Sequence, residues 1–332
     1  MNVEELLWRY GKGEREFGKS ELSNLSLVGQ DLIDIILTDA NLSKTNLTFA
    51  YLNRAQLDRA NLTGAKLSGA TLIKASLNGI NLRDADLHGA TLLSAELQGA
   101  EMTWANLMDS NFVEADMRGV KMSGANLSGA CLRGANLRSE KRGAASDLRS
   151  AKLQYADLRN ANLSGSNLSK ADLSYANLTE AVMRGVDLSG ANLTGANLTG
   201  VMLTDAILNE TNLAGVNLTN AKMERAKVVN CNMIEVSLRG ALMTAIDLTR
   251  TNLTSSDLTK ARMGKADLTR TILCFANLTN VDLVDAQLAK TDLEDANLTR
   301  ANLRRAEISS ANMVGANLTE ATMPDGRVHM AV

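Results

Sequence analysis

The sequence is poor in proline, histidine, cysteine and aromatic residues, and each shortage excludes a class of structure or chemistry. A single proline indicates a backbone whose N–H groups are mostly committed to hydrogen-bonded ladders. The two histidines, His88 and His329, lie in unrelated places and offer no nucleophile–base pair. Clustered cysteine or histidine ligands for zinc are absent as well. We therefore expect no enzyme, with no catalytic residue, no cofactor and no metal.

The chain also lacks an excess of charge of either sign, a long apolar run and a basic leader. Its 35 Lys and Arg residues nearly balance 37 Asp and Glu residues, for a net charge of −2. This balance disfavours nucleic acid and membrane surfaces as partners. No apolar run is long enough to span a membrane, and no signal peptide is recognisable. The three cysteines form no disulfide framework, so we expect a cytoplasmic location.

What the sequence has in abundance is a five-residue word, seen most clearly in residues 191–200, ANLTGANLTG. A small residue comes first, then a polar residue, leucine, and two small or polar residues. The central, third position is nearly always leucine, every fifth residue from Leu22 to Leu137 and again from Leu148 to Met323. The first position is usually alanine. Copies of this five-residue word therefore make up most of the chain.

A period of five fits neither a helix nor a flat strand. On a helix the leucines would spiral around the axis, and on a flat strand they would alternate between faces. They can share one interior only if the chain turns between words. Four turns close a square coil of about twenty residues, and coils stack at about 4.8 Å. The small first residue fits beside leucine inside a narrow tube, while the second, fourth and fifth positions lie outside or at corners.

The word A(D/N)LXX, as in Ala191–Gly195, resembles the pentapeptide-repeat proteins. The resemblance covers most of the chain and implies an all-β fold, the right-handed quadrilateral β-helix. The opening VEELLWRYGKGEREF and the closing MPDG resemble cyanobacterial members, which include regulators of heterocyst differentiation that act through protein partners.

The words divide the chain into five segments. Residues 1–20 form an N-terminal cap, whose residues 2–10 have the apolar spacing of a short amphipathic helix. Residues 21–137 and 148–323 are two blocks of β-helix, separated by the break 138–147. Residues 324–332 are a tail that begins with the turn Pro324-Asp325-Gly326.

The break shifts the frame, because Leu137 and Leu148 are eleven residues apart. This spacing is either two words plus one residue or one word plus six. The segment is basic through Arg138, Lys141 and Arg142. It is either a tolerated surface bulge or a loop that recognises a partner.

Two sets of outward apolar residues are further candidates for a protein-binding surface. Counting in twenties stacks Ile73, Leu93 and Val113 at the fourth position of one face, with Ile33 in line. In the second block one face carries Tyr155, Tyr175 and Phe275 at the fifth position. The two stripes form one ridge if the break is two words plus one, and lie on neighbouring faces if it is one word plus six. Such stripes mark an interaction surface or stabilise the face by cross-strand packing.

Two more faces of the second block repeat polar residues. One repeats Asn at the second position and Thr at the fourth, as in Asn197 and Thr199, which suits an ice-binding array or a structural ladder. The other is rich in arginine and lysine, interrupted by acids, and suits an acidic partner. Its cations are Arg184, Lys222, Arg225, Arg262, Lys265, Arg304 and Arg305.

These features predict a non-catalytic scaffold or regulator that binds another protein through the faces of a rigid β-solenoid. The resemblance suggests a transcription regulator or signalling protein as partner, in cyanobacterial developmental signalling. An end-to-end homodimer is left open. The alternative is a DNA-mimic inhibitor of a type II topoisomerase, as in the quinolone-resistance members. Those have a strongly acidic surface and commonly phenylalanine at the centre, whereas Phe112 is the only phenylalanine centre counted here.

Overall fold

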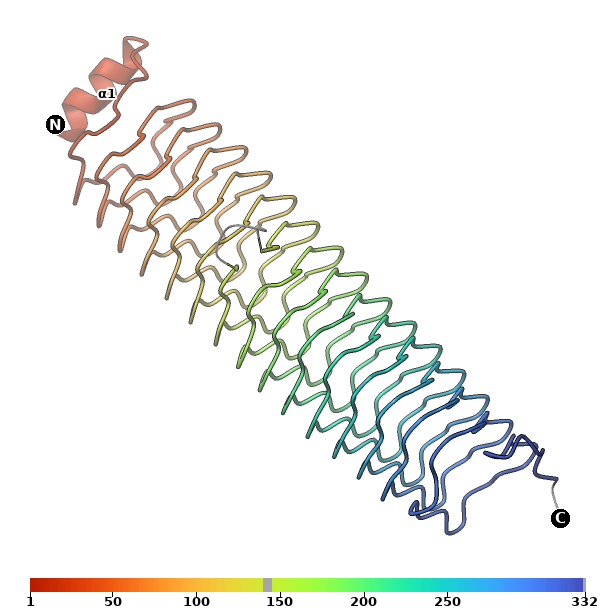
Figure 1. The fold of residues 1–332 in the computed structure, drawn as a ribbon. Coiled ribbons are helices and arrows are strands. Elements are labelled where there is room, and N and C mark those ends of the chain that lie inside the picture. The colour runs from red at the N-terminus through yellow and green to blue at the C-terminus, as the bar shows by residue number, and fades with distance from the viewer. Residues whose placement is uncertain (140–144, 331–332) are drawn as a thin grey trace. The chain divides into compact units, whose positions relative to one another are not determined.

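The computed structural model describes residues 1–139 and 145–330. The chain divides into two compact units, Met1–Ala171 and Asp172–Val332. Each unit is a right-handed quadrilateral β-helix of stacked coils, as predicted (Figure 1). The extended segments are so short that each pairs through a single parallel bridge to the next coil, for example Asn41 with Asn61 and Asn192 with Asn212. Among the described residues, no helix is long and apolar enough to cross a membrane.

The hydrogen bonds of one word explain its composition. In the word Ala196–Gly200, the first N–H donates to the preceding leucine carbonyl (2.9 Å) and the second N–H to the coil before (3.0 Å). The third and fifth N–H groups donate to the coil after, at 2.8 and 2.9 Å. The fourth N–H donates to the side-chain Oδ1 of Asn197 (3.1 Å). All five donors are satisfied, so proline has no place in a regular word and Asn or Asp suits the second position.

The core of each unit is a column of central residues and small first residues. Leu62 and Leu213 are fully buried, as are Ala60 and Ala221. Where the first residue is polar, its hydroxyl donates to a backbone carbonyl, either in the preceding coil, as Thr271 does to Leu248 at 2.8 Å, or in its own coil, as Ser110 does to Leu107. The interior of the described coils is therefore filled by side chains.

The predicted N-terminal helix is present as α1, Val3–Gly11, with Asn2 as its N-cap. The Leu6 side chain of this helix is fully buried, and the Tyr10 hydroxyl donates to the Ile33 carbonyl at 2.8 Å. The helix thus covers the first coil and satisfies part of its edge. This edge begins earlier than residue 21, because Phe17 is a buried word centre and Glu16 pairs with Ile36. The expectation that Phe112 is the only phenylalanine centre was therefore wrong.

The pairing in the first unit resolves the register of the break. Lys121 pairs with Asp147, and Cys131 pairs with Asp157, so the coil around the break holds six extra residues. The break is one word plus six. Because Asn126 pairs with Lys152, Tyr155 lies on the face next to the one that carries Cys131 and Val113. A single apolar ridge across the break is therefore excluded.

The C-terminal tail turns back on the second unit, as the Pro-Asp-Gly sequence predicts. The Gly326 N–H donates to the Met323 carbonyl at 2.9 Å and closes the turn. Thr322 and Val328 then form an antiparallel bridge, in contrast to the parallel bridges of the coils. The turn ends the regular ladder of this unit.

Candidate protein-interaction surfaces

Nearly every described word presents its fifth side chain at a corner of the coil, with the backbone in the left-handed region. Tyr155 and Phe275 have φ of 59°, and Gly195 has φ of 67°. The turn is closed by the hydrogen bond from the next first residue to the central carbonyl, which makes it a type II turn. Because ladder bonds hold both sides of this turn, a corner side chain projects from a fixed backbone.

The aliphatic stripe, Ile33, Ile73, Leu93 and Val113, lies on one outward face of the first unit. All four side chains are only half exposed, since each is shielded by neighbours along the stack. Tyr51, at the second position of this face, is 49% exposed. The burial supports the cross-strand packing interpretation for the aliphatic side chains and leaves Tyr51 as the accessible member.

The three aromatic candidates are much more accessible. The exposed fractions are 69% for Tyr155, 56% for Tyr175 and 61% for Phe275. Within the second unit, the Tyr175 ring lies over Gly195 of the next coil, where an added Cβ would come within 2.7 Å of the ring. Tyr155 belongs to the first unit and Tyr175 to the second.

Two exposed corner aromatics escaped the sequence analysis. Phe49 is 63% exposed and Trp104 is 62% exposed. Each ring lies over the glycine one coil later, Gly69 or Gly124. Each aromatic is the fifth residue of its word, and a glycine follows it twenty residues later in the sequence. This pattern identifies both residues, but a search for stripes of similar residues overlooks an isolated aromatic.

The basic break is only partly described. Arg138 is exposed at its start, and its N–H lies 3.5 Å from the Asn136 Oδ1. Lys141 and Arg142 lie outside the described residues. The recognition loop therefore stays a prediction.

The Asn/Thr face of the second unit is held by hydrogen bonds inside each word. The Thr199 hydroxyl donates to Asn197 Oδ1 at 2.7 Å, and Thr279 does the same to Asn277 at 2.6 Å. These hydroxyl protons are already used, which supports a structural role over an ice-binding array.

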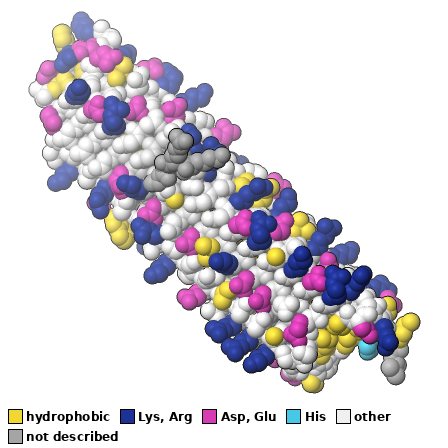
Figure 2. Space-filling view, in the orientation of Figure 1, with side chains coloured by type: hydrophobic (Ala, Val, Ile, Leu, Met, Phe, Trp, Pro, Cys, Tyr) yellow, Lys and Arg dark blue, Asp and Glu magenta, His cyan; other side chains and the backbone are white. Residues whose placement is uncertain are grey.

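On the basic face, arginines of the corner column pair with acids of the adjacent coil. The distance between Arg225 Nε and Asp205 Oδ1 is 2.7 Å, and that between Arg305 Nε and Asp285 Oδ1 is 2.6 Å. The hydrogen bond from arginine lowers the pKa of Asp205 and of Asp285. The pairs neutralise two of the seven cations of this face. Figure 2 likewise shows acidic and basic side chains interspersed, with no continuous acidic region on the visible side of either unit.

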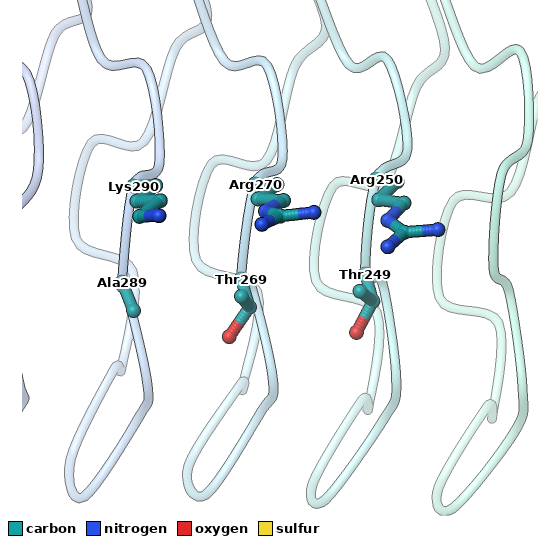
Figure 3. A pocket seen from close by; sticks show the side chains of 6 residues that line it. All are labelled: Thr249, Arg250, Thr269, Arg270, Ala289 and Lys290. Carbon is teal, nitrogen blue, oxygen red and sulfur yellow. The ribbon is translucent and has the colours of Figure 1, made fainter.

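A second basic feature of this unit was not predicted. Arg250, Arg270 and Lys290 follow one another at the fifth position of successive coils, and all three are exposed (Figure 3). With Thr249, Thr269 and Ala289 they line a shallow open groove of about 330 Å³. We call these three cations the cationic column. The cationic column was not predicted from the sequence, because charges were compared along whole faces and the second position of the same words is acidic or polar.

Within 1–139 and 145–330, no group of three His, Cys, Asp or Glu side chains could hold a metal ion. Cys231 is buried at a first position, and its burial raises the pKa of the thiol to about 11. Cys131 and Cys274 are half exposed, and all three cysteines are free.

Comparisons with known proteins agree with the geometry. The family model described as Pentapeptide repeats (8 copies) matches in overlapping segments that together cover residues 20–138 and 146–323. HetL from the cyanobacterium Nostoc sp. strain PCC 7120, a pentapeptide-repeat protein involved in heterocyst differentiation regulation, is 26% identical. The alignment covers 99% of this chain and 100% of HetL, with a TM-score of 0.37.

A second solved structure is QnrB1, a plasmid-mediated fluoroquinolone resistance protein. It is 20% identical over 52% of this chain and 91% of its own, with a TM-score of 0.30. Among curated proteins, none matches this chain.

Proposed function

The chain belongs to the pentapeptide-repeat family, and from this premise we propose that it is a non-catalytic scaffold that binds another protein through the outward faces of its β-helices. The observation that carries the proposal is the display of exposed aromatic side chains at corners with a fixed backbone. Tyr155, Tyr175 and Phe275 are each more than half exposed. A few residues carry most of the binding energy at protein interfaces, and tyrosine and tryptophan are enriched among them. A fixed backbone also reduces the entropy lost on binding.

The filled interior supports a binding role over an enzymatic one. From Phe17 to Leu303 the described central residues are buried, which leaves mainly the second, fourth and fifth positions to vary. A surface that varies over a constant core suits recognition, whereas a substrate site needs a concave pocket with convergent polar groups.

The pairing of charges argues against the DNA-mimic alternative. A mimic of duplex DNA needs an acidic surface without neutralising cations. Here Asp34, Asp39 and Asp205 each pair with an arginine of the adjacent coil. Phe112 and Phe17 are the buried phenylalanine centres, in a core otherwise made largely of leucine and methionine.

A regulatory partner in cyanobacterial developmental signalling, and a cytoplasmic location, complete the proposal. Both rest on the resemblance of the sequence to regulators of that family. The five domain boundaries and an end-to-end homodimer also stay predictions.

The test is affinity capture from native cytosol with three forms of the full chain. These are wild type, the double variant Tyr155→Ser/Tyr175→Ser, and the matched variant Asn160→Ser/Asn230→Ser, which changes corner residues of the same units. We expect one protein to be captured by wild type and the matched variant but lost from the tyrosine variant, with circular dichroism unchanged. A variant in which residues 138–143 become Gly-Ser-Gly-Ser-Gly-Ser tests the break in the same way.

Identical capture by all forms would refute both surfaces. Capture of gyrase subunits by wild type would favour the DNA-mimic alternative over the scaffold.

A further inference from the structure

The arginines of the cationic column differ from the other corner arginines among the described residues. Elsewhere in the corner columns, arginine binds an acid one coil away, as Arg54 binds Asp34 at 2.6 Å and Arg59 binds Asp39 at 2.8 Å. The column instead stacks three cations in succession. Like charges directly opposite each other on a ladder are destabilising. A single acid in the middle position would remove this cost, so the column maintains a positive strip at the expense of stability.

None of the three cations has an ion pair among the residues that the structure describes. Figure 3 shows the guanidinium groups of Arg250 and Arg270 extending in the same direction along the stack, beside Thr249 and Thr269. Their donors are therefore directed along one edge of the groove, where they can bind anions from outside the chain.

We propose that the cationic column binds the acidic face of an α-helix in a partner protein. The inference rests on the proposed function, a protein-binding scaffold, and assigns to it one surface and the chemistry of its partner.

Acids near the column restrict how a partner approaches. Asp247 and Asp267 occupy the second position of the same words, and their Oδ1 atoms accept the N–H groups of Thr249 (3.0 Å) and Thr269 (2.9 Å). On the next side of the coil, Asp292 accepts the Glu294 N–H at 3.2 Å. These carboxylates repel an anion that lies flat on either face. A narrow anionic ridge that meets only the corner avoids them.

The spacing of the column selects a helix as that ridge. Successive coils place the three cations about 4.8 Å apart at the backbone. Side chains three and four residues apart on a helix have Cβ atoms about 5–6 Å apart. Alternate side chains of an extended strand are about 6.6 Å apart, and a strand is flatter than a helix. Glutamates at i, i+4 and i+7 of a helix therefore match three coils most closely.

The first probe is a fluorescein-labelled, alanine-rich helical peptide with three glutamates at i, i+4 and i+7. A second peptide has the same composition with the glutamates spread around the helix, and a third alternates glutamate in an extended, proline-containing chain. Fluorescence anisotropy at low ionic strength measures the affinity of the full-length protein for each. We expect the first peptide to bind most tightly, with an affinity that falls as salt is added.

The variant Arg250→Asn/Arg270→Asn/Lys290→Asn removes the column and retains a residue type that tolerates the left-handed backbone. The control Lys44→Asn/Lys170→Asn/Lys260→Asn removes the same charge from other corners. The loss of three exposed ion pairs predicts an affinity about tenfold lower for the first variant. The control is expected to bind like wild type.

If both variants lose affinity for the peptide equally, net charge alone attracts the peptide and the proposed role of the cationic column is wrong. Equal affinity for the first and second peptides would overturn the helix as its occupant, as would tighter column-dependent binding of an oligonucleotide. If the column variant loses the peptide but still captures the partner of wild type, the proposed function stands and only this assignment of its surface fails.

Discussion

At the scale of the residue, the corner position carries the main local strain of the fold. Lys260, Arg270 and Phe275 all have φ near 60°, a region that costs an L-amino acid about 1–2 kcal/mol. The ladder offsets this cost, since the N–H of Phe275 donates to the Glu294 carbonyl at 3.0 Å. The same bonds fix the direction of the side chain, which is what makes corners suitable for recognition.

The corner glycines below aromatic rings give the first prediction. An added Cβ at Gly124 would collide with the Trp104 ring, whereas one at Gly215 would meet nothing within 4 Å. Both glycines have φ near 66°. We expect Gly215→Ala to lower the free energy of unfolding by about 1 kcal/mol, from backbone strain alone. Gly124→Ala should cost about 2 kcal/mol, because the ring must also leave its packed position.

A double-mutant cycle with Trp104→Ser separates the two causes. In that background Gly124→Ala should cost only the backbone term, so the urea midpoint should fall as it does for Gly215→Ala. If the cost of Gly124→Ala is the same with and without the tryptophan, the ring does not stack on this glycine.

At the scale of the coil, most of the fold follows from the sequence. The period of five, the small first residue and the single proline predict the square coil and the buried central column. The apolar spacing of residues 2–10 predicts the cap, and α1 confirms it. Phe17 was missed because its word, Arg15 to Lys19, lacks both the alanine and the Asn or Asp that identify the others. The corner ion pairs were missed because face-by-face counting does not show that Arg225 and Asp205 share one corner.

The pairs between coils give the second prediction, on the dependence of stability on pH. Hydrogen bonds from arginine lower the pKa of Asp34, Asp39, Asp205 and Asp285. A depressed pKa contributes stability above the unfolded value, about 3.9, and that contribution is lost as the pH falls through the folded value. The melting temperature should thus be unaffected by these groups between pH 7 and about 5 and decline below about 4.

When the pH falls to about 3, the melting temperature of the variant Asp205→Asn/Asp285→Asn should fall by less than that of wild type. The effect is small, because Arg225 and Asp205 are both more than half exposed. Asn230→Ser/Asn280→Ser changes uncharged corner residues of the same unit and serves as the control. If the melting temperature of the aspartate variant falls as much at acidic pH as that of wild type, these pairs do not form in solution.

At the scale of the whole molecule, the candidate surfaces were less predictable than the coils. The sequence identifies Tyr155 and Tyr175 because they are twenty residues apart, yet it does not decide whether they share a face with the aliphatic stripe. The spacing of Leu137 and Leu148 allows two registers, and only the pairing of Lys121 with Asp147 selects between them. A lone insertion in a perfect repeat shifts every later face, so surface predictions depend on a detail that periodicity cannot supply.

This register makes the break a test of the whole repeat. Removing the six residues 140–145 brings Leu148 to five residues after Leu137 and joins Ser139 to Ser146, the buried first residue of the next word. Because the pairing of Asn136 with Asn162 and of Lys121 with Asp147 needs no other change, the shortened chain should keep its circular dichroism spectrum. Its urea midpoint should equal or slightly exceed that of wild type, since a shorter loop costs less closure entropy.

The five-residue deletion 141–145 is the matched control. It removes a whole word length but leaves Leu148 six residues after Leu137 instead of five, so one residue must bulge from the coil or displace a leucine from the core. Displacing one leucine costs about 2–5 kcal/mol, and a bulge breaks a ladder bond, so this variant should unfold at clearly lower urea. The opposite order, in which removing five residues is tolerated and removing six is not, would contradict the register of one word plus six. It would require the following words to turn onto different faces.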